Sequence, residues 1–151
     1  MKRTLTAAIA ATTALTALAP SFAQAEDVTL TYAMWDANQA PVYRQCADKF
    51  EAANPGIRIK VQQDSWDNYW TSLSTAFVAG NAPDVFVNHL SRFPEFLANG
   101  VMVDLAERIA ADQVDMKAYL PGLAESWSKD GQWGLPKDWD TIALVYDKKK
   151  L

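Results

Sequence analysis

Residues 28–61 have the sequence VTLTYAMWDANQAPVYRQCADKFEAANPGIRIKV, and this stretch decides the fold. Apolar and polar residues alternate at its start, from Val28 to about Trp35, and again at its end, from Ile57 to Gln62. A period of two residues is typical of a β-strand. Because a helical pattern and short connections lie between the two predicted strands, the stretch favours parallel strands joined by a helical crossover.

The intervening helix is predicted over about 40–53 by a stripe of apolar residues. This stripe consists of Val42, Cys46 and Phe50, which recur every four residues, with Tyr43 and Ala47 beside them. Such spacing indicates an amphipathic helix with one apolar face. Asn54-Pro55-Gly56 then ends the helix with a stop signal and a turn.

Strands and helices continue to alternate beyond residue 61. A second helix that closes near Gly80 is predicted from the helical spacing of Trp66, Tyr69, Trp70, Leu73 and Phe77. Val85–Val87 predicts a short buried strand, and a third short helix carries Phe93, Phe96 and Leu97. The order βαβαβα predicts an α/β fold with a mostly parallel sheet flanked by helices. Since the first two strands alternate polar and apolar residues, we expect them to be partly exposed or near an edge.

The stretch after the third helix is less regular. Asp104 and Glu107 fit a capping box that opens a helix. Residues 119–127 predict another short helix, and Asp130-Gly131 predicts a tight turn. Thr141 to Tyr146 predicts a final strand, which leads into the lysine run at the end of the sequence.

The first 25 residues predict export. Lys2 and Arg3 precede an uncharged run rich in Ala, Leu and Thr, and Ala23-Gln24-Ala25 supplies the small residues that a signal peptidase recognises. The alternative is a membrane anchor, but the apolar run is shorter than the roughly 20 residues that a span needs. We therefore expect residues 1–25 to be a secretory signal peptide and the chain to be periplasmic.

The composition is that of an ordinary globular protein, with 50% hydrophobic and 21% charged residues among 151. The net charge of -4 disfavours binding to nucleic acid. With one cysteine, Cys46, and one histidine, His89, the chain can form no internal disulfide and no cysteine-based zinc site. An unpaired thiol in an oxidising compartment is best buried, so we expect Cys46 to be buried. We expect a monomer with no metal and no cofactor.

Polar and aromatic side chains stand beside the ends of the predicted strands. In an open α/β sheet, ligands bind beyond the carboxyl ends of the strands, so these side chains are candidates for ligand binding. They are Trp35, Asp36, Asp64, Trp66, Asn88 and His89, which follow the first three strands, and Asp138 and Asp140, which precede the last. Carboxylates and amides pair with sugar hydroxyls, and an indole covers the apolar face of a sugar ring. The pattern therefore predicts a site for a neutral polyhydroxy ligand.

Several of these residues also have a structural interpretation. Trp70 matches the apolar stripe of the second helix and is expected in the core. For Trp66, in the first turn of that helix, a core role and a site role are equally compatible with the pattern. Asp64 could cap the second helix, Asp36 could begin a loop, and His89 could be a hydrogen-bonded loop residue.

Enzyme chemistry is weakly supported by the sequence. It contains no G-x-S-x-G, no glycine-rich phosphate loop and no H-E-x-x-H. Asp138 and Asp140 could suggest a glycosidase, which needs one protonated and one ionised carboxyl group. Nothing local to these two residues would raise the pKa of either carboxyl, so we expect the chain not to be an enzyme.

Five motifs, in this order, carry a resemblance. They are LTYAMW at 30–35, FEAANPGI at 50–57, GNAPDVF at 80–86, FLANGVMVDL at 96–105 and GLPKDWDT at 134–141. On these motifs the chain resembles the extracellular solute-binding proteins of ABC transporters, in the sugar-binding family 1 that includes maltose-binding proteins. The motif positions of the family point to the same eight candidate residues.

The resemblance implies a two-lobed protein that closes around a sugar and delivers it to the permease subunits of an inner-membrane ABC importer. It implies that residues 26–140 are an incomplete N-terminal lobe, that 141–151 cross toward the second lobe, and that this second lobe is missing here. A polyol, glycerol phosphate or polyamine stays open as the ligand. A phosphate would need arginines at the site, where the sequence indicates only Lys137. A secreted glycoside-acting enzyme is the alternative from another class.

Overall fold

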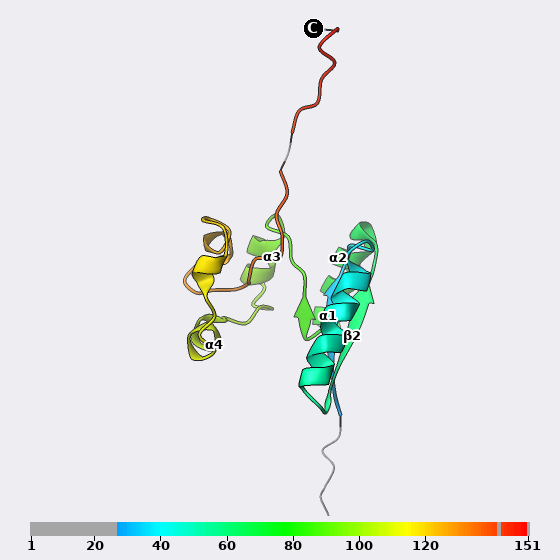
Figure 1. Ribbon diagram of the computed structural model, residues 1–151, viewed down its shortest axis with the longest axis vertical. Coiled ribbons are helices and arrows are strands. Elements are labelled where there is room, and N and C mark those ends of the chain that lie inside the picture. Colours follow the sequence, from blue (N-terminus) through cyan, green and yellow to red (C-terminus); the bar gives the residue numbers. More distant parts are fainter. Residues whose placement is uncertain (1–26, 142, 151) are drawn as a thin grey trace, which may run out of the picture.

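The computed structural model describes residues 27–141 and 143–150, which form a three-stranded parallel sheet with helices around it (Figure 1). The elements in chain order are β1 (Val28–Met34), α1 (Ala40–Ala53), β2 (Ile57–Gln63), α2 (Trp66–Ala79), β3 (Val85–Phe86), α3 (Phe93–Ala98), α4 (Ala106–Ala111) and the 3₁₀ turns η1 (Met116–Ala118) and η2 (Glu125–Trp127). The predicted βαβαβα order and the α/β fold are confirmed. The predicted signal peptide lies outside the described residues.

The strand order is β2-β1-β3. β1 and β2 pair along their whole length, from Val28 opposite Ile57 to Met34 opposite Gln63, whereas β3 pairs with β1 over two residues only. β1 is therefore the central strand and β2 an edge strand, and both are partly exposed, so the expectation that the first two strands are partly exposed or near an edge is confirmed. The alternating pattern of β1 reflects exposure of its first half, where Val28 is 54% exposed.

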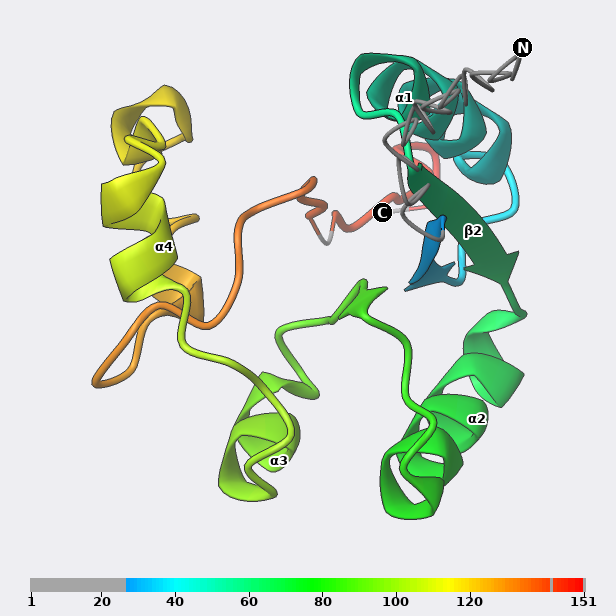
Figure 2. The same ribbon diagram turned by 90° about the horizontal axis from the view of Figure 1, so that it is seen from below.

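The two long helices cover opposite faces of the sheet. Tyr32 of β1 stacks on Tyr43 of α1, with ring centroids 5.3 Å apart. The next residue, Ala33, belongs to a buried cluster with residues of α2. Successive side chains of a strand point to opposite faces, so α1 and α2 lie on either side of the sheet. Figure 2 shows β2 between these two helices.

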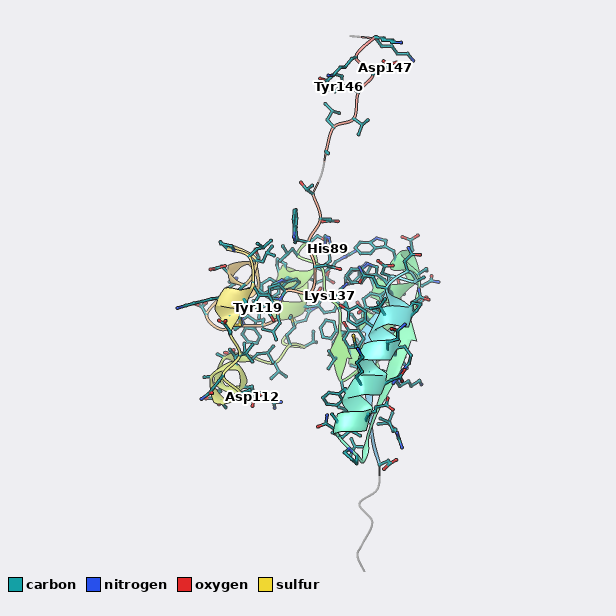
Figure 3. The ribbon with its side chains drawn as sticks, viewed as in Figure 1. His89, Asp112, Tyr119, Lys137, Tyr146 and Asp147 are labelled. Carbon is teal, nitrogen blue, oxygen red and sulfur yellow. The ribbon has the colours of Figure 1, made fainter. Side chains whose placement is uncertain are left out.

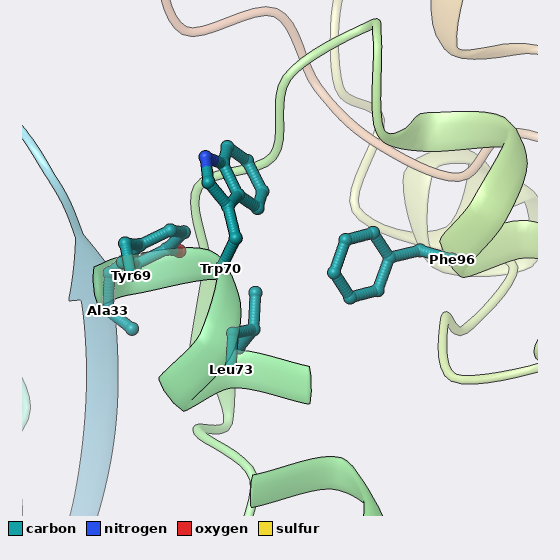
Figure 4. Packing of buried hydrophobic residues seen from close by; sticks show 5 residues of the cluster. All are labelled: Ala33, Tyr69, Trp70, Leu73 and Phe96. Atoms are coloured by element: carbon teal, nitrogen blue, oxygen red, sulfur yellow. Dashed lines mark hydrogen bonds between the residues drawn. The ribbon is translucent and has the colours of Figure 1, made fainter. Parts of the chain in front are cut away.

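The main core lies between β1, α2 and α3 (Figure 4). It consists of Ala33, Tyr69, Trp70, Leu73 and Phe96. The apolar stripe predicted on α2 is thus confirmed at its centre, and Trp70 is a core residue as expected. Trp66 in the first turn of α2 is 44% exposed. Gly80 ends α2 at φ 73, a left-handed conformation that glycine adopts without strain.

On α1 the predicted helix bounds are confirmed, but the predicted apolar stripe is exposed. Val42 and Phe50 are 58% and 45% exposed, and Cys46 is exposed as well. The side of α1 that faces the sheet carries Tyr43 and the buried Ala47 instead. Two apolar stripes lie side by side on this helix, and contacts with the sheet select the second one. The expectation of a buried thiol was therefore wrong.

The last third of the chain departs from the sequence predictions in two places. No strand forms at 141–146, where the described residues are exposed and have no strand beside them to supply hydrogen bonds. Figure 3 shows Tyr146 and Asp147 on a segment that projects from the body of the molecule. Instead of a helix, residues 119–127 form turns and the short η2.

The predicted helix near Asp104 is present, although the capping box is not formed as expected. Leu105 is the N-cap of α4, and Asp104 Oδ1 accepts from the backbone N–H groups of Ala106 and Gln132, at 2.9 and 3.0 Å. The predicted turn at Asp130 is confirmed by its φ of 55 and by the bridge between Ser128 and Gln132. None of the described helices is both long and apolar enough to span a membrane.

An ion-pair network fastens α1 to β2. Glu51 Oε1 accepts the backbone N–H of Ile59 at 2.9 Å and pairs with Arg44, while Oε2 lies 3.4 Å from Arg58 Nη1. Arg44 also donates to the carbonyl oxygen of Ile59. The Ile59 N–H, followed by Arg44, lowers the pKa of Glu51 below its ordinary value of 4.5. The charged form of Glu51 therefore supports the fold.

The network predicts a pH-dependent stability. Because the pKa of Glu51 is lower in the folded protein, its contribution is present above pH 4.5 and is lost as the pH falls through the folded pKa. In the full-length protein that carries this sequence, we expect Glu51→Gln to lower the Tm at pH 7 and to matter less in acid. The exposed Glu125→Gln serves as the control, with no change expected. A Tm difference that persists unchanged well below pH 4.5 would contradict this assignment.

Candidate ligand-binding site

The loops that follow the three strands are tied together at the carboxyl edge of the sheet. The backbone N–H of Asp64 donates to the carbonyl oxygen of Met34 at 3.1 Å, and Gln63 Nε2 donates to the carbonyl oxygen of Trp35 at 3.0 Å. On the other side of β1, the Val87 N–H donates to the Ala33 carbonyl oxygen at 2.9 Å. The predicted meeting of the strand ends is therefore present in the structure.

Tyr69 of α2 holds this edge together through its buried hydroxyl group. Its hydroxyl donates to the carbonyl oxygen of Val87 at 2.8 Å and lies 3.2 Å from that of Ala33. Burial raises the pKa of Tyr69 well above its ordinary value, so the hydroxyl stays protonated and remains a donor. One side chain thus holds α2, β1 and the loop after β3 in a fixed arrangement.

Five rings from three chain segments gather at the edge, and we call them the aromatic cluster. They are Trp35, Trp66, Tyr69, Trp70 and His89. The centroid of Trp35 lies 5.0 Å from that of Trp66 and 6.4 Å from that of His89, while Trp66 lies 5.5 Å from His89. These contacts are edge-to-face, the geometry that aromatic quadrupoles favour. The predicted residues Trp35, Trp66 and His89 are therefore brought together.

Two of the predicted carboxylates are engaged by their own loops. Asp36 Oδ1 accepts the backbone N–H of Asn38 at 2.8 Å. Asp64 accepts the Ser65 N–H at 2.8 Å through Oδ1 and the Ser72 hydroxyl at 3.2 Å through Oδ2. The N-cap of α2 is Ser65, not Asp64, so the capping alternative for Asp64 was wrong. Both carboxylates are therefore held in fixed orientations, which is the preorganisation that a binding site requires.

Asn88 and His89 are half-buried in the loop after β3. Asn88 Oδ1 accepts the backbone N–H of His89 at 2.8 Å. His89 Nδ1 accepts the Ser91 N–H at 3.2 Å and lies 2.8 Å from the Ser91 hydroxyl oxygen. Because Nδ1 acts as an acceptor, the proton of the neutral ring lies on Nε2. His89 therefore has an N–H donor on the ring atom that Ser91 does not engage.

Asp138, which precedes the projecting segment, lies at the same edge of the sheet. Its Oδ2 accepts from Gln39 Nε2 at 3.0 Å and pairs with Lys137 Nζ, which lies 5.4 Å above the Tyr43 ring. Burial raises the pKa of Asp138, but the hydrogen bonds from Lys137 and Gln39 outweigh it and the pKa is lowered.

The eight predicted residues are not all brought together. Asp36 and Asp138 are linked through Gln39, whose backbone N–H lies 3.3 Å from Asp36 Oδ1. Asp140 is exposed, next to the exposed end of the described chain, and makes none of these contacts. The sequence also predicted Lys137 as the only basic residue here, yet the Arg92 guanidinium lies 5.5 Å above the Trp70 ring.

Two residues of the edge were missed by sequence reasoning. Gln39 stands three residues after Asp36 and directly before α1, a position whose signal is the polar residue ahead of Ala40-Pro41. Arg92 stands directly before α3, three residues after His89, and forms an ion pair with Glu95 at 3.5 Å. Neither residue follows a strand immediately, so the search of strand ends did not reach them.

A parallel α/β layer with a polar and aromatic edge at the ends of its strands is an arrangement typical of small-molecule binding. Comparison with known sequences agrees with this class, because the pattern of the bacterial extracellular solute-binding proteins matches residues 45–151. The chain belongs to this family, as the motifs predicted.

The names of several similar proteins mention a sugar or an oligosaccharide. The sugar-binding protein MalE of Xanthomonas citri has a TM-score of 0.65 and 27% identity over 70% of this chain and 27% of that structure. An ABC substrate-binding protein of Listeria monocytogenes, solved in complex with cycloalternan, has a TM-score of 0.63 and 27% identity over 72% and 28%. The maltotriose-binding protein of Pyrococcus abyssi is 26% identical over 74% of this chain and 24% of its own length. The chain thus spans about a quarter of these relatives.

Removing the Tyr69 hydroxyl tests how the edge is held. Tyr69→Phe leaves the buried carbonyl oxygen of Val87 without its donor, so we expect a loss of about 1–3 kcal/mol in the free energy of unfolding of the full-length protein. Urea unfolding gives this value. Tyr146→Phe, at a side chain that is 55% exposed, is the control and should cost nothing measurable. Equal stability of Tyr69→Phe and the parent would refute the role of this hydroxyl.

Proposed function

We propose that this chain is part of a periplasmic protein that binds a mono- or oligosaccharide for delivery to the permease of an ABC importer. The observation that carries the proposal is the aromatic cluster, with Trp35, Trp66 and His89 in mutual contact beside fixed carboxylate and amide groups. The sugar-binding names of similar proteins support it.

The chemistry of this edge suits a sugar. Hydroxyl groups donate to carboxylates such as Asp64 and accept from donors such as His89 Nε2, while an exposed indole covers a C–H face. A hydrogen bond to a charged group contributes about 1.5–3 kcal/mol, and apolar burial adds about 25 cal/mol per Å². A few such contacts reach the roughly 8 kcal/mol of micromolar binding. Lys137 and Arg92 are each paired with a carboxylate, which makes the edge less suited to phosphate.

We further propose that binding proceeds by closure of two lobes around the sugar. In this view residues 26–140 belong to the first lobe and 141–151 lead toward the second. The exposed, projecting arrangement of the described residues after Thr141 supports the proposal, since such a segment suits a connection between lobes. The ligand stabilises the closed state by its greater affinity for it.

Binding without covalent chemistry is favoured over glycoside cleavage. A glycosidase needs a carboxyl group whose pKa is raised so that it can donate a proton. The pKa of Asp138 is lowered instead, and its Oδ2 is engaged by Lys137 and Gln39. Asp138 therefore suits the role of a fixed acceptor for hydroxyl groups.

Calorimetry on the full-length protein tests the proposed ligand. The panel contains glucose, maltose, maltotriose, glycerol phosphate and spermidine. We expect at least one sugar to bind with micromolar or tighter affinity and to be recovered uncleaved after incubation. Tight binding of spermidine or glycerol phosphate without sugar binding would show that the ligand is not a sugar. Cleavage products would show that the protein is an enzyme rather than a binding protein.

Substitutions at the edge test the assigned site. We expect Trp35→Ala and Asp138→Asn each to weaken binding of the preferred sugar at least tenfold, about 1.4 kcal/mol, because one removes an aromatic surface and the other a charged acceptor. Asp112→Asn, at an exposed position after α4, is the matched control for loss of a carboxylate. Unchanged affinity in both edge variants would contradict the assignment of the binding site to this edge.

A further inference from the structure

Among the residues that the structure describes, the Trp70 side chain carries a buried N–H group without a partner. Trp70 is 7% exposed, and its Nε1 makes no hydrogen bond within the described part of the chain. Two other aromatic polar groups are paired: the Tyr69 hydroxyl donates to the Val87 carbonyl oxygen, and Trp133 Nε1 donates to the Lys129 carbonyl oxygen at 2.9 Å. A buried donor without an acceptor is unfavourable, so this N–H calls for an explanation.

Trp70 lies between the core and the candidate site. Its ring centroid is 6.2 Å from that of Phe96 in the core, and 5.3 and 5.2 Å from those of Trp35 and Trp66 at the edge. Figure 4 shows the indole nitrogen on the part of the ring turned away from Leu73 and Phe96. The unpaired donor therefore lies on the side of the ring away from these two core residues.

We propose that Trp70 Nε1–H donates a hydrogen bond to a hydroxyl oxygen of the bound solute. This inference rests on the proposed function and adds a residue that determines which solute binds. Trp66 is the most exposed ring of the aromatic cluster, at 44%, while Trp35 and His89 are half-buried and Tyr69 is buried. Displacement of Trp66 would therefore give a solute a route to the donor. Trp66 also contacts both Trp70 and His89 edge-on, so its displacement opens the centre of the aromatic cluster.

The donor selects between the ligand classes that the edge could otherwise accept. A hydroxyl oxygen accepts from the indole N–H and still gives its own proton to a carboxylate such as Asp64. An ammonium group has donors only and cannot accept the Trp70 N–H, so a polyamine leaves it unpaired. A site that leaves its buried donor unpaired discriminates strongly against such a ligand.

The test removes the N–H and keeps the ring. In the full-length protein, Trp70 is replaced by β-(3-benzothienyl)alanine, in which sulfur stands in place of N–H, and separately by phenylalanine. We expect each variant to bind the preferred sugar of the panel about tenfold more weakly than the parent, about 1.4 kcal/mol. We expect the sulfur analogue to keep the Tm of the ligand-free protein, since no internal hydrogen bond is lost.

Trp133→Phe is the matched control. It removes an N–H that is paired with Lys129 and should lower the Tm without changing sugar affinity. In the parent, the indole N–H resonance that disappears in Trp70→Phe should move downfield when sugar is added. If the parent binds sugar and the sulfur analogue binds it equally well, the Trp70 inference is overturned while the proposed function stands. If the parent binds no hydroxyl-bearing solute, the proposed function itself is overturned, and the Trp70 inference with it.

Discussion

The Tyr69 hydroxyl is the interaction on which the carboxyl edge of the sheet depends. β3 pairs with β1 over only two residues, too few to fix the loop that follows it. The bond from the Tyr69 hydroxyl to the Val87 carbonyl oxygen supplies what the short strand lacks, and the hydroxyl oxygen also lies 3.2 Å from the carbonyl oxygen of Ala33 in the central strand. The relative positions of Trp35, which follows β1, and His89, which follows β3, therefore depend on a side chain of α2.

Local periodicity was enough to predict most of the fold. The stripe around Trp70 and Leu73 identified α2, and the bounds of α1 agree with the structure. The face of α1 that is buried could not be predicted, because two apolar stripes lie side by side and the Glu51 contact with Ile59, from another element, selects between them. The strand expected at 141–146 failed for a related reason, since a strand exists only beside a partner that local sequence does not reveal.

The candidate site was predicted where a residue directly follows a strand and was missed elsewhere. Trp35, Trp66 and His89 meet as expected because parallel strands bring their carboxyl ends to one edge. The Gln39 contact with Asp138 joins residues 99 positions apart, and no spacing rule in the sequence links them. The orphan N–H of Trp70 was equally invisible, since periodicity indicates that a ring is buried but not which of its atoms finds a partner.

The spacing of the indoles has an optical consequence. Trp35, Trp66 and Trp70 have ring centroids 5.0 to 5.3 Å apart, close enough for their excited states to couple. Coupled transitions of this kind give paired bands of opposite sign in circular dichroism, and the signs depend on the angles between the rings. The interplanar angles here range from 41° to 89°, so the cluster is chiral and its spectrum records its own geometry. The protein thus contains an intrinsic spectroscopic reporter at the edge of its sheet.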